Sequence, residues 1–350
     1  MSTHIVEKCA VTAEENWERL RRDYAHNGIA LALGAGVSID SKLPHWRELL
    51  ERIAEKCFEN TGKKLVDEMI GDGFSLPAIA GILEAECPAE KNFSELIRDA
   101  LYEKFEFYRR KSPVQNKAEF VDYVKTNNPT LAAVAALCVR KPSNSNYITN
   151  PLVHAIANSN FDAILRAYSN RRYQPHILRT VDRPSAKALP ERINVYHVHG
   201  FFQFDEKYIG DATKEAPDIR VFTEHEYFDF FNQPTGLFSY TFLYLLREFI
   251  VLFIGMSLKD DNIRRLLHYS REEIRGSYVK EGESSYKALK KSLRHYAIQK
   301  RTKSPQLNDL TEVSLRRLGV RTLWIDKFTE IPTRLQELYE STGDKWSDVY

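Results

Sequence analysis

The stretch Ile29-Ala-Leu-Ala-Leu33, followed by Gly34-Ala-Gly-Val-Ser38, decides the fold class of this chain. Its first five residues are a short apolar run next to glycine, which is typical of a buried strand. After the glycines, Trp46, Leu49 and Ile53 recur at the three- and four-residue steps of one helical face. A strand, a glycine turn and a helix in this order open a βαβ unit.

The same alternation of strand and helix continues through the second half of the chain. Strand-like runs are predicted at 155–157, 193–198, 250–254 and 322–325. Helical stretches are predicted between them at 161–168, 240–249 and 262–269. Strands that alternate with helices predict an α/β fold, here a Rossmann-like, mostly parallel sheet with helices on both faces.

The region between the first strand and this second half is helical and has few strand signals. Apolar residues recur at helical steps in four segments, at 66–70, 76–86, 94–107 and 131–139. We therefore predict one domain over residues 1–350, with a Rossmann-like core formed by 28–61 and 150–326. Residues 62–149 are predicted as an inserted helical subdomain, and 327–350 as a C-terminal helix.

Composition excludes several classes of protein. The 350 residues carry 50 Lys and Arg against 48 Asp and Glu, so the chain is not basic overall like a protein that coats nucleic acid. Its length is sufficient for a large core, which buries roughly 75% of the surface of an unfolded chain of this size.

The four cysteines and the apolar runs predict the compartment. Cys9, Cys57, Cys87 and Cys138 include no pair with the close spacing of a structural zinc site, so we predict no metal. So few cysteines suggest a reducing compartment. The N-terminus has no apolar leader, and the most apolar run, 249–256, is too short for a bilayer. We expect a cytoplasmic protein without a membrane segment.

The glycine loop 34–38 is the first candidate for chemistry. Glycines after a strand let the backbone approach a phosphate, and a following helix N-terminus offers unpaired N–H groups. The dinucleotide fingerprint is incomplete, because a third glycine would be expected at Ile39. A tight turn without a ligand is the alternative for these residues.

The second candidate is Asn158-Ser-Asn-Phe-Asp162, which follows a predicted strand. Parallel α/β sheets bind ligands at the carboxyl ends of their strands, and an asparagine can both donate to and accept from an amide or a ribose. In the alternative interpretation, Asn160 or Asp162 only caps a helix over 163–170.

Two further motifs close strands. His197-Val-His-Gly200 ends the strand 193–198, and a histidine with a pKa of about 6.5 suits a general base. A structural histidine is the alternative, and strand alternation does not choose between His197 and His199. In the segment 254–265, Ser257 could bind an adenosine ribose, whereas Asp260 and Asp261 are predicted to cap the next helix.

The order of these four motifs resembles the sirtuin superfamily, most closely the bacterial sirtuin-like NAD hydrolases of anti-phage defence. These include the proteins of Thoeris systems and those encoded beside a HerA-type ATPase. The resemblance implies NAD+ as the substrate and a role for nine residues. Asn160 would hold the nicotinamide ribose or the attacking water, His199 would be the catalytic base, and Asp162 would support the loop of Asn160. The loop at the NAD diphosphate would consist of Gly34, Ala35, Gly36 and Ser38. The adenosine half would be contacted by Gly255 and Ser257.

The chain departs from the family pattern at several positions. Lys42 stands where a glycine is usual, and Asn158-Ser159 replace the usual Thr-Gln or Thr-Thr. Pro44-His-Trp-Arg47 replaces the Pro-Asp-Phe-Arg of deacylating sirtuins. Deacylating members also carry a four-cysteine zinc module that these cysteines cannot form, which favours attack by water.

We therefore expect an NAD+ hydrolase that acts in anti-phage defence. Deacylation or ADP-ribosyl transfer is one alternative, and a non-catalytic NAD-sensing module is another. An unregulated NAD hydrolase would kill its host, so we expect gating through a homo-oligomer or a separate protein. The resemblance makes a HerA-type hexameric ATPase the leading candidate partner, with a phage-derived or nucleic-acid trigger that acts through it.

A basic stretch is the last feature of the sequence. Seven Lys and Arg residues lie between Lys287 and Lys303, and this stretch contains no acidic residue. A solvated helix followed by a loop would explain the pattern. A docking surface for an acidic partner or a nucleic acid would also explain it.

Overall fold

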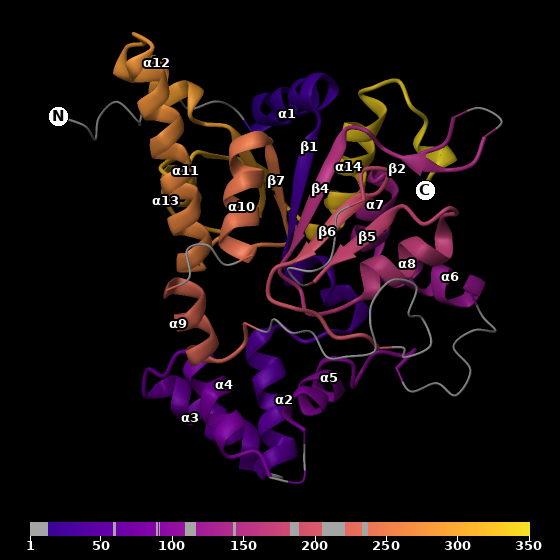
Figure 1. Cartoon of the computed structure of the whole chain (residues 1–350), viewed down its shortest axis with the longest axis vertical. Coiled ribbons are helices and arrows are strands. Elements are labelled where there is room, and N and C mark those ends of the chain that lie inside the picture. The colour runs from indigo at the N-terminus through magenta and orange to yellow at the C-terminus, as the bar shows by residue number, and fades with distance from the viewer. Residues whose placement is uncertain are drawn as a thin grey trace.

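A seven-stranded sheet in the order β5-β6-β4-β1-β7-β8-β9 forms the centre of the computed structural model (Figure 1). The structure describes residues 13–58, 61–88, 90, 92–108, 117–142, 145–182, 189–204, 221–232 and 237–350. Every neighbouring pair of strands in this sheet is parallel. The strands are β1 (Ile29–Leu33), β4 (Val153–Asn158), β5 (Leu178–Val181), β6 (Ile193–His197), β7 (Val251–Ile254), β8 (His295–Lys300) and β9 (Val320–Ile325). The predicted mostly parallel α/β fold is confirmed.

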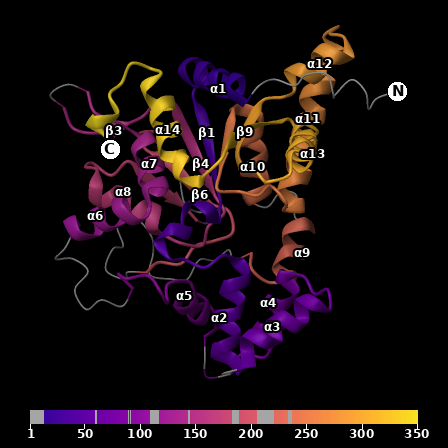
Figure 2. The same cartoon turned by 180° about the vertical axis from the view of Figure 1, so that it is seen from behind.

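Helices cover both faces of the sheet, because both sides of the strands are apolar. The described α-helices are α1 (Ala13–Asn27), α2 (Trp46–Phe58), α3 (Gly62–Gly71), α4 (Leu76–Ala85), α5 (Phe93–Leu101), α6 (Lys117–Asn127), α7 (Pro129–Leu137), α8 (Ile164–Arg172), α9 (Glu224–Asn232), α10 (Leu237–Glu248), α11 (Asp261–Lys280), α12 (Ser285–Lys291), α13 (Pro305–Arg316) and α14 (Ile331–Glu340). Figures 1 and 2 show α10, α11 and α13 on one side of the sheet and α7, α8 and α14 on the other.

Strand alternation divides the core between these two faces. Ile29, Leu31 and Leu33 of β1 belong to the cluster that includes α7, α8 and α14, whereas Ala30 and Ala32 belong to the cluster of α10, α11 and α13. All five residues are buried. The run of apolar residues is therefore continuous because the strand has helices on both sides.

The predicted helical insertion 62–149 lies in two places. Helices α3, α4 and α5 pack with α2 in a small lobe beyond the carboxyl ends of the strands, and α9 contacts α4 (Figure 1). Helix α7 instead packs against α8 and α14 over the sheet, and α6 packs against α7 and α8. A two-stranded hairpin of β2 (Val139–Arg140) and β3 (Ile148–Thr149) follows α7.

The structure corrects the sequence interpretation at three points. In the basic stretch, α12 agrees with the expected helix, but strand β8 takes the place of the expected loop. Strand β5 was missed because it has only four residues. The glycine loop itself contains a short 3-10 helix, Ala35–Val37, and a second one, Ile39–Ser41, follows before α2 begins. Pro44 explains this delay, because the residue before a proline disfavours helical backbone.

The remaining terminal elements are short. The predicted C-terminal helix 327–350 contains α14 with a 3-10 turn on each side. Cys57, Cys87 and Cys138 are reduced thiols that form no disulfide, and Cys9 lies outside the described residues. No helix in the described ranges is both long and apolar enough to cross a bilayer.

Asn128 connects the glycine loop to the helix layer. Its side-chain amide donates to the Val37 carbonyl at 2.8 Å and to the Ser41 hydroxyl at 2.9 Å. Its carbonyl oxygen accepts from the Leu131 N–H at 3.0 Å and so caps α7. Because Asn128 is fully buried, all three bonds form away from water.

We predict that Asn128→Ala lowers the free energy of unfolding by about 2–3 kcal/mol. The variant loses a helix cap and leaves two buried acceptors without their donor. Urea denaturation measures the change, and the exposed neighbour Asn127, changed to Ala, is the control and should shift stability by less than about 0.5 kcal/mol. Equal midpoints for the two variants would contradict this role of Asn128.

Candidate functional site

Four strands of the sheet end at the same level. In the strand register, Leu33 of β1 pairs with Asn158 of β4 and with Ile254 of β7, and Asn158 pairs with His197 of β6. The loops that follow these four residues therefore leave one edge of the sheet together. Strand β1 has β4 on one side and β7 on the other, so this is the point where the chain direction across the sheet reverses. Open α/β sheets bind their ligands in the crevice at this point.

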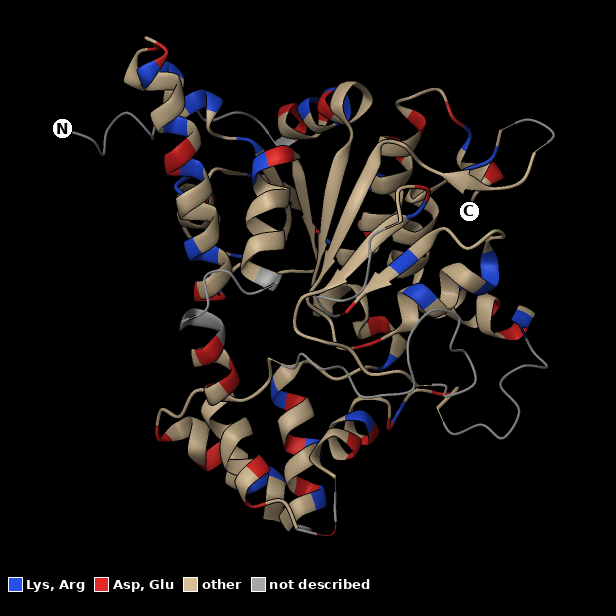
Figure 3. Ribbon diagram, in the orientation of Figure 1, with Lys and Arg blue, Asp and Glu red and all other residues tan. Residues whose placement is uncertain are grey.

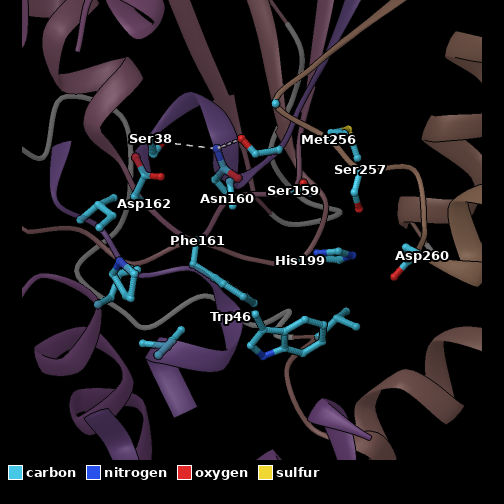
Figure 4. A pocket seen from close by; sticks show the side chains of 18 of the residues that line it. Ser38, Trp46, Ser159, Asn160, Phe161, Asp162, His199, Met256, Ser257 and Asp260 are labelled. Carbon is cyan, nitrogen blue, oxygen red and sulfur yellow. Dashed lines mark hydrogen bonds between the residues drawn. The ribbon is translucent and has the colours of Figure 1, made fainter. Parts of the chain in front are cut away.

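A cavity of about 380 Å³ opens at this edge (Figure 4). A volume of this size is within the range of small-molecule sites. The first turns of α2 and α11 and the residues Val221 and Tyr227 complete its wall. Eight of the nine predicted site residues line it, namely Gly34, Ala35, Ser38, Asn160, Asp162, His199, Gly255 and Ser257.

The ninth residue, Gly36, holds two loops of the cavity together. Its N–H donates to the Gly255 carbonyl at 3.0 Å, and a Cβ on Gly36 would lie 2.8 Å from the Gly255 Cα. Gly255 has a φ of +69°, and a Cβ there would lie 2.6 Å from the Val37 nitrogen. Glycine is required at both positions because the two backbones touch.

Ala35 presents the backbone donor of the glycine loop. The N–H groups of Gly34, Gly36, Val37 and Ser38 all donate to protein carbonyls. Within the described residues no hydrogen bond from the Ala35 N–H is found, and Ala35 is exposed on the cavity wall. This N–H is a suitable donor for an anionic oxygen of a ligand.

Asn160, Ser38 and Asp162 form a buried hydrogen-bond chain (Figure 4). The Asn160 Nδ2 donates to the Gly34 carbonyl at 3.0 Å and to the Ser38 Oγ at 3.3 Å. The Ser38 hydroxyl in turn donates to the Asp162 carboxylate. Both amide hydrogens of Asn160 are therefore used, and its Oδ1 is the atom that can accept from a ligand.

Asp162 fixes the loop after β4 rather than capping α8 directly. Its Oδ1 accepts from the Ile164 N–H at 3.0 Å, whereas the N-cap residue of α8 is Ala163. Burial raises the pKa of Asp162, and the hydrogen bonds from Ser38 and Ile164 offset only part of this rise. The Tyr102 hydroxyl also holds this loop, because it accepts from the Ala163 N–H at 2.9 Å and donates to the Phe202 carbonyl at 2.5 Å.

The two histidines of the third motif occupy different environments. His199 lines the cavity and bonds to the Ser159 backbone carbonyl. His197 is buried outside the cavity lining, packs on Phe201 at a ring distance of 4.7 Å and bonds to the Asn160 backbone carbonyl. Burial lowers the pKa of His197 to about 4, so this imidazole stays neutral.

Asp260 gives the site a negative charge that was not predicted there. As predicted, it caps α11, since its Oδ1 accepts from the Asn262 N–H at 2.9 Å and the Ile263 N–H at 3.0 Å. It also lines the cavity opposite His199 (Figure 4). Burial lowers the pKa of His199, and the charge of Asp260 partly opposes that shift. A cap and a cavity residue look alike in sequence, so no local signal separated them.

Aromatic side chains that the sequence analysis did not assign form another wall. Trp46 stacks on Tyr227 at a ring distance of 5.8 Å, and Phe161 lies 6.3 Å from the His199 ring. These rings come from three segments that are far apart in sequence. In the described part of the chain, no group of three or more His, Cys, Asp or Glu side chains is arranged to hold a metal ion.

The sheet order and the loops at its reversal point define a Rossmann-like α/β protein. Residues 154–315 match the family model described as SIR2-like domain. This match supports a sirtuin-like family for the chain and is compatible with NAD binding and an NAD-using activity. It includes the loops of Asn160, His199 and Gly255, whereas the glycine loop 34–38 lies before it. No curated protein matches the chain.

We predict that Gly255→Ala disrupts the contact between the loop after β1 and the loop after β7. The new methyl group meets backbone atoms, so we expect a loss of about 1–3 kcal/mol in the free energy of unfolding and weaker NAD+ binding. Urea denaturation and calorimetric titration with NAD+ measure the two effects.

Gly276→Ala is the matched control, because a Cβ at Gly276 in α11 meets no atom within 4 Å. Alanine in a helix interior should raise stability there by about 0.5–1 kcal/mol. A Gly255→Ala protein that binds NAD+ with unchanged affinity would contradict the importance of this contact.

Proposed function

We propose that this protein hydrolyses NAD+ to nicotinamide and ADP-ribose. The observation that carries this proposal is the placement of the Asn160 amide and the His199 imidazole on one cavity, beside a glycine loop with an available N–H. The two residues follow separate strands, β4 and β6, so the cavity exists only in the folded sheet. The SIR2-like match over both loops supports NAD+ as the substrate.

The reaction breaks the bond between the ribose C1′ and the nicotinamide nitrogen and forms a bond from C1′ to water. Nicotinamide leaves as a neutral molecule from a cationic pyridinium, so no general acid is needed. The barrier lies in the positive charge that develops at C1′, as in glycoside cleavage. The protein must therefore hold the ribose, orient one water and accept one proton.

Asn160 is suited to hold the ribose or the water. Its two amide hydrogens are fixed on the Gly34 carbonyl and Ser38, and this sets the orientation of the side chain before the substrate binds. The Oδ1 atom can then accept a hydrogen bond from a ribose hydroxyl or from the attacking water. A preset acceptor of this kind lowers the entropic part of the barrier.

His199 is suited to accept the proton. Its pKa is lowered by burial, so the imidazole is neutral and basic near neutral pH. Its bond to the Ser159 carbonyl fixes the ring, and the Asp260 carboxylate stabilises the imidazolium that forms when the proton is taken. The planar rings of Trp46, Phe161 and Tyr227 supply apolar surface for the nicotinamide ring.

We predict that Asn160→Ala and His199→Ala each lower kcat/KM for nicotinamide release by about 100-fold or more. If both residues serve one transition state, the double variant is little worse than either single variant. The KM for NAD+ should rise in Asn160→Ala, which also releases the Gly34 carbonyl, and stay nearly constant in His199→Ala.

His197→Ala is the matched control for this series. It should lower the unfolding temperature, because a buried ring is removed, and retain most of the hydrolysis of the folded protein. Full NAD+ hydrolysis by a folded His199→Ala protein would overturn the proposed role of His199. If the wild-type chain releases nicotinamide only when an acyl-peptide or an acceptor protein is added, the reaction is transfer rather than hydrolysis.

We predict that Asp260→Asn moves the acidic limb of the pH profile to lower pH. Asn keeps the helix cap but removes the negative charge that raises the pKa of His199. Because the base must be neutral, a lower pKa keeps it active at lower pH. Asp261→Asn, an exposed change in the first turn of α11, should leave the profile in place. A limb that is identical in all three proteins would show that Asp260 does not act on the base.

We further propose that this activity depletes NAD+ in bacterial anti-phage defence and is gated by assembly. The proposal rests on the resemblance of the four motifs to defence proteins, and it makes a second copy of the chain or a HerA-type hexameric ATPase the partner. Co-expression with such an ATPase, followed by measurement of cellular NAD+ before and after phage infection, tests it. NAD+ loss that needs no partner and no infection would contradict gating.

A further inference from the structure

A second cleft, of about 870 Å³, lies at the opposite edge of the sheet from the catalytic cavity. It is lined by residues at or just before the amino ends of four strands, among them His154, Ile250, Leu293 and Arg321. Helices α1, α11 and α12 and the end of α10 supply most of the rest of its wall. The two sites share no lining residue.

The charge of this cleft is strongly biased. Six basic residues line it, Arg19, Lys287, Lys290, Lys291, Arg294 and Arg321, against two acidic residues, Asp23 and Glu248. Figure 3 shows the basic residues of α12 at the end of the molecule that is far from the lobe of α2 to α5. The first half of the basic stretch 287–303 therefore contributes exposed cations to the rim of a concave site.

Arg321 gives the strongest indication that the cleft binds a ligand. Its side chain is 8% exposed and lines the cleft, yet it makes no hydrogen bond or ion pair with any described residue. Arg19 lies beside it; this residue is partly buried, and its Nε atom is buried without a partner. The nearby Asp23 carboxylate accepts from the Tyr296 hydroxyl at 2.5 Å. A buried guanidinium group beside a second, partly buried one of like charge favours an anion between them.

The rim of the cleft adds cations that are available. Lys287 and Lys290 on α12 are exposed and form no ion pair with the described residues. In contrast, Lys291 pairs with Glu283, and Arg294 donates to the backbone carbonyls of Arg247 and Glu248. The rings of Phe249 and Tyr278 supply apolar surface in the same lining.

We infer that this cleft binds a nucleoside polyphosphate, with its terminal phosphate at Arg321 and Arg19 and its remaining phosphates near Lys287 and Lys290. Planar guanidinium groups suit the oxygens of a terminal phosphate, and the apolar rings suit a base. A nucleic-acid backbone carries its phosphates along a strand and does not reach a buried guanidinium at the base of a cleft. This geometry favours a small ligand that enters end-on.

Calorimetric titration of the full chain with ATP, tripolyphosphate and adenosine tests this inference. We expect ATP and tripolyphosphate to bind and adenosine not to bind. Lys287→Gln combined with Lys290→Gln should weaken ATP binding by about tenfold or more, and Arg321→Gln should abolish it. Lys300→Gln combined with Lys303→Gln is the matched control, because these lysines belong to the same basic stretch but do not line the cleft.

Each other outcome overturns the inference. Equal losses in the Lys287/Lys290 and Lys300/Lys303 variants would indicate nonspecific charge attraction. Absence of ATP and tripolyphosphate binding at millimolar concentration, or binding of a single-stranded RNA alone, would exclude a nucleotide site. If Arg321→Gln fails to fold, the exposed Lys287 and Lys290 variants still decide the result. NAD+ hydrolysis without ATP should be unchanged in both lysine variants, which separates this site from the catalytic one.

Discussion

The contact between the Gly36 and Gly255 backbones is the constraint on which the cavity at the carboxyl ends of the strands depends. These residues follow β1 and β7, the two neighbouring strands at which the chain changes direction across the sheet. Without side chains, the loops approach until the Gly36 N–H donates to the Gly255 carbonyl at 3.0 Å. The contact fixes the first loop, the first loop fixes Asn160 through the Gly34 carbonyl, and the cavity wall follows from both.

Hydrogen bonding changes what the predicted site residues can do. The Ser38 hydroxyl accepts a hydrogen bond from Asn160 and donates one to Asp162. Ser38 therefore connects the glycine loop to the loop after β4, and its hydroxyl hydrogen is not available to a ligand. The backbone N–H of Ala35 is a better donor for an anionic ligand, since the neighbouring N–H groups are occupied. Motif likeness identified the loop, whereas the bonding pattern identifies which atom in the loop is available.

The sequence predicted the elements whose patterns are local. The buried strand β1 and the face of α2 follow from an apolar run and from a helical period, and both are present. Strand β8 was missed because its apolar run has only three residues and lies between the basic residues Arg294 and Lys300. The strand is stabilised by pairing with β7 and β9 on either side, which the local sequence does not show. The wall of Trp46 and Tyr227 and the second role of Asp260 depend on tertiary contacts, which no local pattern encodes.

Helix α11 connects the two edges of the sheet. It has 20 residues and so spans about 30 Å. Asp260 caps its first turn at the cavity that contains Asn160 and His199, and Tyr278 near its last turn lines the basic cleft. The acidic start and the basic surroundings of its end both agree with the helix dipole.

Coupling between distant sites requires an element whose position both sites influence. Because the two sites share no residue, any effect of an anion in the cleft on Asp260, and through it on His199, would pass along α11 or through the strands that α11 covers.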